Sequence, residues 1–320
     1  MLQCIGRGLA TGLGPATDDG VWGMSLRAQV AGRLIQMGAG RMVRPPAALR
    51  FPELTMAATT THRVATEAGE VACTAYRPTT APADGPAGVY VNFHGGGYVV
   101  RYPEQDDALC RYLAHHSGCV VLNVDYDVAP QRPFPVAPLQ AHGVGAWAAT
   151  AGAEFGWDGG RLAVGGQSAG GGLAAAACRL GRDRGTFTPR LQVLLYPPTD
   201  LTIPPDRKHA LAAKPVITPG ISAIFNEAYV PDPATRSDPL VSPAAASDLA
   251  GLPPALIITA ELDTLREEGD RFATALAAAG VPVVHKVFPG VDHAFTHQEP
   301  AAVAIEAYAL VADQIAGCLA

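Results

Sequence analysis

The fold of this chain is decided by the stretch Arg161-Leu-Ala-Val-Gly165-Gly-Gln-Ser168-Ala-Gly170-Gly-Gly-Leu173-Ala-Ala-Ala-Ala-Cys178-Arg-Leu180. Residues 161–165 predict a short buried strand, and residues 173–180 are rich in good helix formers. A strand that turns into a helix so quickly needs a strained backbone at Ser168 and little crowding, and the flanking Gly166 and Gly170 meet both needs. The pattern predicts a G-x-S-x-G nucleophile elbow. The alternative is a glycine-rich turn with an idle serine.

Composition limits the class of protein. The chain has 320 residues, enough for one large domain or two small ones. Hydrophobic residues make up 48% and charged residues only 16%, so the chain can bury a sizeable core. The net charge is −6 and no basic run stands out, so we expect no nucleic-acid partner.

Cysteine usage and the chain start bear on the compartment. The cysteines are scattered and form no C-x-x-C pair, which favours reduced thiols; they are Cys4, Cys73, Cys110, Cys119, Cys178 and Cys318. The start carries Arg7, Asp18 and Asp19 without a continuous apolar run, so we expect no secretory signal. The uncharged segment 133–153 contains prolines and polar residues that disfavour a membrane span. We expect a cytoplasmic protein without stable membrane insertion.

Strand and helix patterns alternate along most of the chain. The expected strands are 70–77, 88–93, 119–124, 161–165, 191–195, 255–259 and 281–287. The expected helices between them are 104–117, 136–151, 173–180, 267–279 and 301–318. This alternation predicts an α/β fold with a mostly parallel sheet covered by helices on both faces.

Two segments interrupt this alternation and predict a helical cap. The predicted division is an N-terminal cap segment 1–55, a first core part 56–200, a cap insertion 201–250 and a second core part 251–320. Residues 21–37 predict an amphipathic helix with Leu26, Val30 and Leu34 on one face. That apolar face must cover another part of the protein. The helix could belong to the core or form a lid, and the sequence does not distinguish the two.

A serine nucleophile needs a base, and the base needs a partner that holds its tautomer. In an elbow architecture the acid and then the histidine follow on loops after late strands. Asp263 follows the expected strand 255–259, and His293 follows the expected strand 281–287. We therefore predict that Ser168, Asp263 and His293 form a catalytic triad.

Three other residues compete for these roles. Glu261 lies in the same loop as Asp263 but nearer the strand, so it ranks second as the acid. His285 lies inside an expected strand, where a core histidine is the usual reading. His297 lies four residues after His293, a spacing that suits two zinc ligands on one helical face. Because no H-E-x-x-H pattern is present, we expect no metal.

The run His94-Gly95-Gly96-Gly97 comes directly after the expected strand 88–93. Attack on an ester creates an oxyanion, which needs N–H donors already in place. We predict that the N–H groups of Gly95, Gly96 and Ala169 form this oxyanion hole, with Gly97 giving the loop its freedom. His94 is predicted to be a structural hydrogen-bonding residue. A phosphate loop is disfavoured because no G-x-x-x-x-G-K pattern is present.

Together these motifs resemble the hormone-sensitive-lipase-like group (bacterial family IV) of α/β-hydrolase esterases, over about residues 85 to 318. The resemblance rests on His94-Gly-Gly-Gly97, Asp125-Tyr126, Ala129-Pro130, Pro133-Phe-Pro135, Gly166-Gln-Ser-Ala-Gly-Gly171, Tyr196-Pro197, Asp200, Asp263-Thr-Leu-Arg-Glu-Glu-Gly269 and His293-Ala-Phe295. It implies hydrolysis of short- to medium-chain carboxylic esters without a cofactor. It also implies a cap built from the N-terminal segment and the insertion after Asp200.

The chain departs from the usual pattern of this group at six positions. Gln167 stands where Asp is usual, Asp127-Val128 where Arg-Leu is usual, and Gln131 where Glu is usual; Ala294 and Thr264 replace a common Gly and a common Pro. The triad and the oxyanion glycines are intact. The departures put the subgroup and its substrate in question.

The leading hypothesis is a serine esterase acting on a small-molecule ester through an acyl-enzyme. The same chemistry would serve an amide, carbamate or aryl-formamide, and a non-catalytic ligand-binding protein on the same scaffold is a further alternative. Trp22, Met24, Ile221 and Phe225 are candidates for the acyl pocket or, equally, for the core of the cap. A homodimer is possible.

Overall fold

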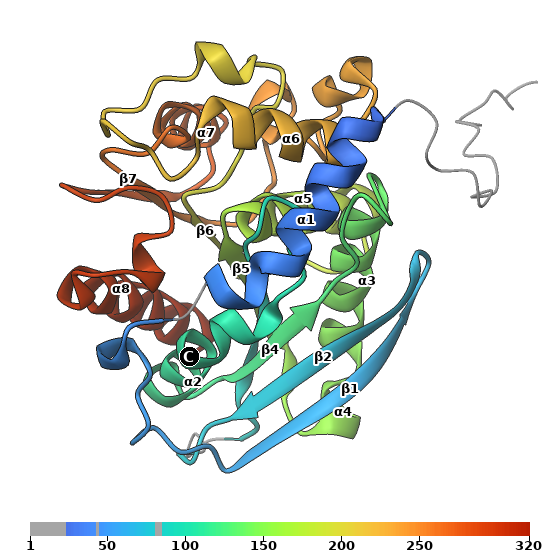
Figure 1. The fold of residues 1–320 in the computed structure, drawn as a ribbon. Coiled ribbons are helices and arrows are strands. Elements are labelled where there is room, and N and C mark those ends of the chain that lie inside the picture. Colours follow the sequence, from blue (N-terminus) through green and yellow to red (C-terminus); the bar gives the residue numbers. More distant parts are fainter. Residues whose placement is uncertain (1–23, 43–44, 81–84) are drawn as a thin grey trace, which may run out of the picture.

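The computed structural model describes residues 24–42, 45–80 and 85–320. An eight-stranded sheet with the order β1-β2-β4-β3-β5-β6-β7-β8 runs through the molecule (Figure 1). The strands are β1 (Ala58–Thr66), β2 (Gly69–Arg77), β3 (Gly88–Phe93), β4 (Val120–Asp125), β5 (Asp158–Gln167), β6 (Leu191–Leu195), β7 (Ala255–Ala260) and β8 (Val283–Phe288). Along this order, all neighbouring strands from β4 to β8 are parallel. β2 pairs antiparallel with both of its neighbours, β1 and β4.

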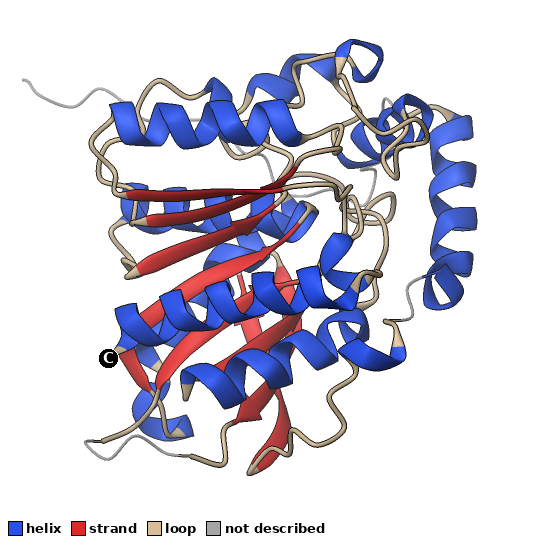
Figure 2. Cartoon of the chain, turned by 90° about the vertical axis from the view of Figure 1, so that its left-hand side faces the viewer, coloured by secondary structure: helices blue, strands red, loops and turns tan. Residues whose placement is uncertain are grey.

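Helices cover both faces of the sheet (Figure 2). Alternate residues of β3 enter two separate cores: Val89 and Val91 pack on one face, and Tyr90 packs on the other. The first core includes residues of α3 (Val136–Thr150), α5 (Ala169–Arg184) and α7 (Arg266–Ala278), and the second includes α2 (Asp107–Ser117) and α8 (Ala301–Leu319). The predicted α/β architecture, with a mostly parallel sheet between two helical layers, is confirmed.

Local chemistry explains where several helices begin and end. α2 and α5 end at Gly118 and Gly185, whose φ angles of 70° and 63° lie in the left-handed region that glycine adopts freely. α6 (Pro219–Tyr229) begins with proline, and the Thr218 side chain accepts the Ile221 N–H as an N-cap. The short helix α4 (Gly152–Phe155) and the edge strand β1 were not among the predicted elements.

Among the described helices, α8 has the length and apolar composition of a membrane span. Its Ala304, Tyr308, Val311 and Ile315 are buried in the second core, next to α2 and the sheet. Packing on the sheet therefore accounts for the apolar composition of α8. The expectation of no stable membrane insertion stays a prediction.

The cap helix α1 (Leu26–Met42) lies beside α6 at the carboxyl ends of the parallel strands (Figure 1). The expectation that its large apolar side chains cover something is wrong: Leu26, Val30 and Leu34 are 75%, 49% and 61% exposed. The buried face instead carries Ala28 and Gly32. The predicted division into core and cap segments is otherwise untested, and residues 1–23, with Trp22, lie outside the described part.

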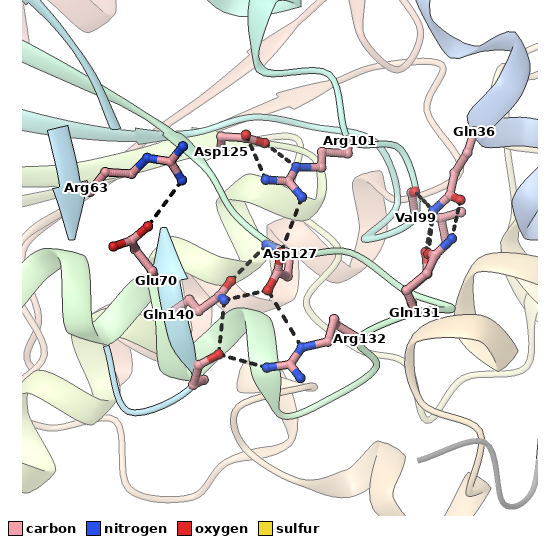
Figure 3. A network of polar contacts seen from close by, with 12 residues as sticks. Gln36, Arg63, Glu70, Val99, Arg101, Asp125, Asp127, Gln131, Arg132 and Gln140 are labelled. Carbon is pink, nitrogen blue, oxygen red and sulfur yellow. Dashed lines mark hydrogen bonds and ion pairs between the residues drawn. The ribbon is translucent and has the colours of Figure 1, made fainter. Parts of the chain in front are cut away.

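The face of α1 that packs inward carries small residues and a side chain that forms hydrogen bonds with the core. A Cβ atom on Gly32 would lie 3.3 Å from the Pro130 ring, so the helix backbone comes close to the core. One turn on, Gln36 Nε2 donates to the carbonyl oxygens of Val99 and Ala129 at 2.8 and 2.9 Å. The Gln36 and Gln131 side-chain amides also bond to each other (Figure 3). Gln131, one of the departures from the family pattern, thus anchors the cap.

Asp127, a second departure, belongs to a polar cluster close to this anchor (Figure 3). Its carboxylate accepts from Gln140 Nε2 at 2.9 Å, and its backbone N–H donates to Gln140 Oε1 at 2.8 Å. Arg101 and Arg132 lie 3.4 and 3.7 Å from its carboxylate. Arg101 also donates two hydrogen bonds to the Asp125 carboxylate. The segment after β4 is therefore held in place by several ion pairs and hydrogen bonds.

Candidate active site

The turn between β5 and α5 holds Ser168 in a strained conformation, with φ 51° and ψ −123°. The glycines around it are required by close backbone packing. A Cβ on Gly170 would lie 1.8 Å from the Phe93 carbonyl oxygen, and one on Gly166 would lie 2.3 Å from the same atom. The end of β3 therefore presses directly on the elbow, and only glycine fits at these two positions.

Ser168, His293 and Asp263 meet at this elbow. His293 Nε2 lies 2.8 Å from Ser168 Oγ, and His293 Nδ1 lies 2.7 Å from Asp263 Oδ2. A carboxylate can only accept, so Nδ1 carries the proton and Nε2 is free to accept the serine hydroxyl proton. The other carboxylate oxygen, Oδ1, accepts the Leu265 N–H at 2.9 Å. Asp263 and His293 are both buried. The arrangement can activate a serine for acyl transfer.

The competing residues have other partners. Glu261 Oε2 accepts the Gly290 N–H at 2.7 Å, which ties the acid loop to the histidine loop. His285 lies on β8, 3.0 Å from Asp270. His297 belongs to the buried network described below and contacts Asp106.

The glycine run after β3 passes next to the serine. A Cβ on Gly95 would lie 3.5 Å from Ser168 Cβ. Gly96 and Gly97 have φ angles of 128° and 60°, and a Cβ on Gly97 would overlap the Phe225 ring. Ala169 is the first residue of α5, so its N–H is at the positive end of the helix dipole. Gly95 and Ala169 thus lie next to the nucleophile, Gly96 lines the same cavity as Ser168, and the catalytic role of their N–H groups stays a prediction.

His94 is buried and positions the glycine loop. Its Nδ1–H donates to the Gly95 carbonyl oxygen at 2.7 Å, and its ring stacks on Tyr126 with centroids 4.3 Å apart. Tyr126 Oη donates in turn to the His94 carbonyl oxygen at 2.8 Å. Burial lowers the pKa of His94, so the imidazole is held neutral. These contacts match the structural part predicted for this histidine.

A buried polar network under the elbow was not found by sequence reasoning. Gln167 Nε2 donates to the carboxylate of Asp106, and Tyr196 Oη donates to Gln167 Oε1 at 2.6 Å. His297 Nε2 and Asn92 Nδ2 donate to the same carboxylate at 3.1 and 2.9 Å. A carboxylate therefore lies beside Gln167, and it is that of Asp106, 61 residues upstream.

The same network reaches the catalytic histidine. The Tyr196 ring packs edge-on against the His293 imidazole, with centroids 4.9 Å apart. Tyr196 Oη also bonds Thr296 Oγ1, which lies 2.9 Å from His297 Nδ1. The elbow, the end of β6 and the histidine loop are therefore connected by one set of buried hydrogen bonds.

Two cavities meet at Ser168. The larger has a volume of about 520 Å³, and its lining includes Gly95, Gly96, His293 and Ile221. The smaller has a volume of about 40 Å³. Of the apolar residues considered for an acyl pocket, Ile221 lines the larger cavity and Phe225 lines both. Met24 is buried in the cap.

Comparison with known proteins agrees with this geometry. A family model described as alpha/beta hydrolase fold matches residues 90–297. Carboxylic ester hydrolase LipN of Mycobacterium tuberculosis is 39% identical over 234 residues, which cover 71% of this chain and 61% of LipN. Ethyl acetate hydrolase of Pseudomonas putida is 38% identical over 224 residues, which cover 69% of this chain and 70% of that enzyme.

Solved structures show the same similarity. The thermostable carboxylesterase EstE1, cloned from a metagenomic library, superposes with a TM-score of 0.78 at 32% identity. The match covers 92% of this chain and 96% of EstE1. A thermostable esterase from Pseudomonas putida superposes with a TM-score of 0.79 at 29% identity, covering 93% of this chain and 98% of that esterase.

Proposed function

The chain belongs to the hormone-sensitive-lipase-like group of the α/β-hydrolase fold family, and on that premise we propose that it is a serine carboxylesterase. The observation that carries the proposal is the hydrogen-bonded chain Asp263–His293–Ser168, with contacts of 2.7 and 2.8 Å, opening into a cavity of about 520 Å³. The substrate is a small-molecule ester with a short- to medium-length acyl chain.

The chemistry follows from the positions of these atoms. Ser168 Oγ attacks the ester carbonyl carbon while His293 Nε2 takes the hydroxyl proton. The N–H groups of Gly95, Gly96 and Ala169 stabilise the oxyanion. His293 then gives its proton to the departing alkoxide, and a water attacks the acyl-enzyme by the same route. Asp263 keeps the imidazole in the required tautomer and stabilises its charged form.

Replacing the nucleophile tests the proposal. Ser168→Ala is expected to lower kcat for p-nitrophenyl butanoate by about 10⁴- to 10⁶-fold, because the attacking group is lost. Ser117→Ala, at the distant end of α2, serves as the matched serine control and should retain wild-type turnover. Substantial turnover by Ser168→Ala would rule out the nucleophile. If the enzyme hydrolyses a matched anilide faster than the corresponding ester, the preferred substrate is an amide and not an ester.

We further propose that the protein is cytoplasmic and forms a homodimer. A cytoplasmic location is supported by the free thiols of the five described cysteines, and burial raises the pKa of Cys73 and Cys119 to about 12. A homodimer is supported by β8, which ends the sheet and exposes Val284, because an edge strand can pair with a second copy. Light scattering on the purified protein tests the dimer, and detection of the native protein in a soluble cell fraction tests the location.

A further inference from the structure

We propose that His297 is held as an imidazolium ion by the Asp106 carboxylate, and that this buried ion pair positions the loop of the catalytic His293 against the nucleophile elbow. His297 is thus a positioning residue of the reaction. Its effect on catalysis rests on the proposed esterase function, whereas its protonation state can be measured without any activity.

The Gln167 side-chain amide fixes the direction of the hydrogen bonds in this network. Its Nε2 faces Asp106 Oδ1, because a carboxylate only accepts hydrogen bonds and would repel the amide oxygen. Gln167 Oε1 therefore faces Tyr196 Oη, 2.6 Å away, and accepts the tyrosine proton. The Tyr196 hydroxyl then has no proton left for its other neighbour, Thr296 Oγ1.

The Thr296 hydroxyl passes this direction on to His297. Thr296 Oγ1 donates to Tyr196 Oη, because the tyrosine proton is already used. Thr296 Oγ1 can then only accept from His297 Nδ1, 2.9 Å away, so Nδ1 carries a proton. On the other side of the ring, Nε2 lies 3.1 Å from Asp106 Oδ1, and a hydrogen bond there needs a second proton. The His297–Asp106 pair therefore holds two protons, one more than the catalytic histidine–aspartate pair.

The second proton belongs to His297 and not to Asp106. An imidazole is ordinarily a stronger base than a carboxylate. The carboxylate also accepts from Gln167 Nε2 and, at 2.9 Å, from Asn92 Nδ2, and such donors stabilise its charged form. The His297 and Asp106 side chains are 5% and 0% exposed, so each buried charge has its partner within hydrogen-bonding distance.

A neutral His297 is the competing arrangement. Gln167 Nε2 lies 3.1 Å from His297 Nε2, which would accept its second N–H if that nitrogen carried no proton. The lone pair of Nε2 would then face Asp106 Oδ1 at 3.1 Å without a proton between the two acceptors, which is unfavourable in a buried site. The two arrangements differ in whether Nε2 is protonated, and a nitrogen spectrum distinguishes them.

The ion pair connects the elbow to the histidine loop. On one side Asp106 accepts from Gln167, which directly precedes the nucleophile. On the other side His297 Nδ1 donates to Thr296, three residues after the catalytic histidine. Tyr196, which accepts the Thr296 proton, packs its ring against the catalytic imidazole with centroids 4.9 Å apart. Loss of either ring proton of His297 breaks one end of this connection, so the imidazole and the serine are held less firmly in register.

His297 acts through these contacts and not on the substrate. It lines the larger cavity, but its side chain is only 5% exposed. Both of its N–H groups are used within the protein, so neither remains for an ester oxygen. Substitution of His297 is therefore expected to lower kcat and to leave KM almost unchanged.

The first test is the nitrogen NMR spectrum of the histidine side chains in the full chain at pH 7. His297, assigned by the signals lost in His297→Gln, should show two protonated ring nitrogens. His94 is the reference for a neutral ring, because burial lowers its pKa, and it should show one protonated and one unprotonated nitrogen. Asp106→Asn should convert His297 to the neutral pattern. An unprotonated nitrogen in His297 of the wild-type protein would overturn the inference.

Turnover tests the positioning role. His297→Gln should lower kcat for p-nitrophenyl butanoate about tenfold, with KM within about twofold of wild type, because the catalytic imidazole is less well placed. His285→Gln is the matched control. His285 lies 3.0 Å from Asp270 in another histidine–aspartate pair, but on β8 and outside the described lining of the two cavities at Ser168, so it should keep wild-type kcat. Wild-type turnover by His297→Gln, or an equal loss in both variants, would overturn the positioning role.

Two variants of Thr296 supply the same information if His297→Gln does not fold. Thr296→Ser keeps the hydroxyl and should retain most of kcat and both protonated nitrogens of His297. Thr296→Val removes the acceptor of Nδ1, so His297 should lose one ring proton and kcat should fall about tenfold. Two protonated nitrogens that persist in Thr296→Val would overturn the inference. Thermal unfolding verifies the fold of each variant.

The outcomes separate this inference from the proposed function. The wild-type spectrum does not depend on activity, and hydrolysis that depends on Ser168 does not require a charged His297. A neutral His297 in a protein that hydrolyses p-nitrophenyl butanoate would overturn the inference and leave the esterase standing. Two protonated nitrogens in a protein that hydrolyses no ester would overturn the proposed function, and with it the catalytic effect of the ion pair.

Discussion

The elbow and the cap helix α1 contact the core in opposite ways. In α5 the first twelve residues are all buried except Arg179, and a Cβ on Gly170 would overlap backbone atoms of β3. In α1 the large apolar side chains face solvent, and the helix rests on Gly32 and on hydrogen bonds from Gln36. The elbow is thus held by close contact with backbone atoms at Gly166 and Gly170, whereas α1 is held at a few points along one face.

This difference indicates where substitutions will be tolerated. A position whose Cβ would overlap backbone atoms cannot change without moving a strand, because interiors are close-packed. A position on the outward face of α1 touches little and can change freely. The predictions below test this contrast, beginning with the largest expected effect.

Gly170→Ala should be the most damaging of these substitutions. Its Cβ would lie 1.8 Å from the Phe93 carbonyl oxygen, so β3 and the glycine loop must shift, and we expect a loss of at least about 3 kcal/mol in unfolding free energy. Gly220→Ala in α6 is the matched control: nothing lies within 4 Å of its Cβ, so a gain of about 0.5–1 kcal/mol is expected. Urea denaturation measures both. Equal changes in unfolding free energy for the two variants would contradict the proposed difference between the close-packed elbow and an open helix position.

Asp106→Asn tests the buried network under the elbow. Asp106 accepts hydrogen bonds from Gln167, His297 and Asn92, and loss of its charge should cost about 1.5–3 kcal/mol of unfolding free energy. Asp107→Asn is the control, because its half-exposed pair with Arg111 is worth only about 0.5 kcal/mol. Thermal or urea unfolding compares the two variants. If Asp107→Asn proves the more costly, the network does not support the elbow.

Ala294→Gly should stabilise the protein. Ala294 has φ 60°, a left-handed conformation that costs a residue with a Cβ about 1–2 kcal/mol. Glycine removes this cost but adds about 0.5–1 kcal/mol of chain entropy, so a net gain of roughly 0.5–1 kcal/mol is expected. Ala277→Gly, on the exposed side of α7, should instead lose about 1 kcal/mol. A shift of the melting temperature in the same direction for both would contradict the strain at Ala294.

Leu34→Lys on the outward face of α1 should have the smallest effect, within about 0.5 kcal/mol, because the side chain is 61% exposed. Ala28→Leu, on the buried face, should cost about 1–3 kcal/mol by overpacking. Differential scanning calorimetry distinguishes the two. A large loss in Leu34→Lys would show that the apolar face of α1 is covered in solution.

Much of the site followed from local sequence. The elbow, the glycine run and the loops of Asp263 and His293 were located because each follows an expected strand, and parallel strands bring their carboxyl ends to one edge of the sheet. The strands and helices of the α/β alternation were found by periodicity. The strand β1 was missed because most of its residues, including the run Thr59-Thr60-Thr61, are exposed or half-buried, which leaves little apolar alternation.

Other features depend on contacts between distant residues. Asp106 and His297 are 191 residues apart, and no pattern in either segment signals that they meet beside Gln167. The division of the space around Ser168 into two cavities likewise depends on residues from several distant segments.

The sequence by itself determined the alternation of most strands and helices, the strained serine turn and the candidate triad, because turn chemistry and hydrophobic periodicity are local properties of the chain. Only the tertiary structure decided which face of α1 packs, which carboxylate stands beside Gln167, and how space is divided around Ser168. These depend on close approach and hydrogen bonding between segments far apart in sequence, which periodicity does not encode.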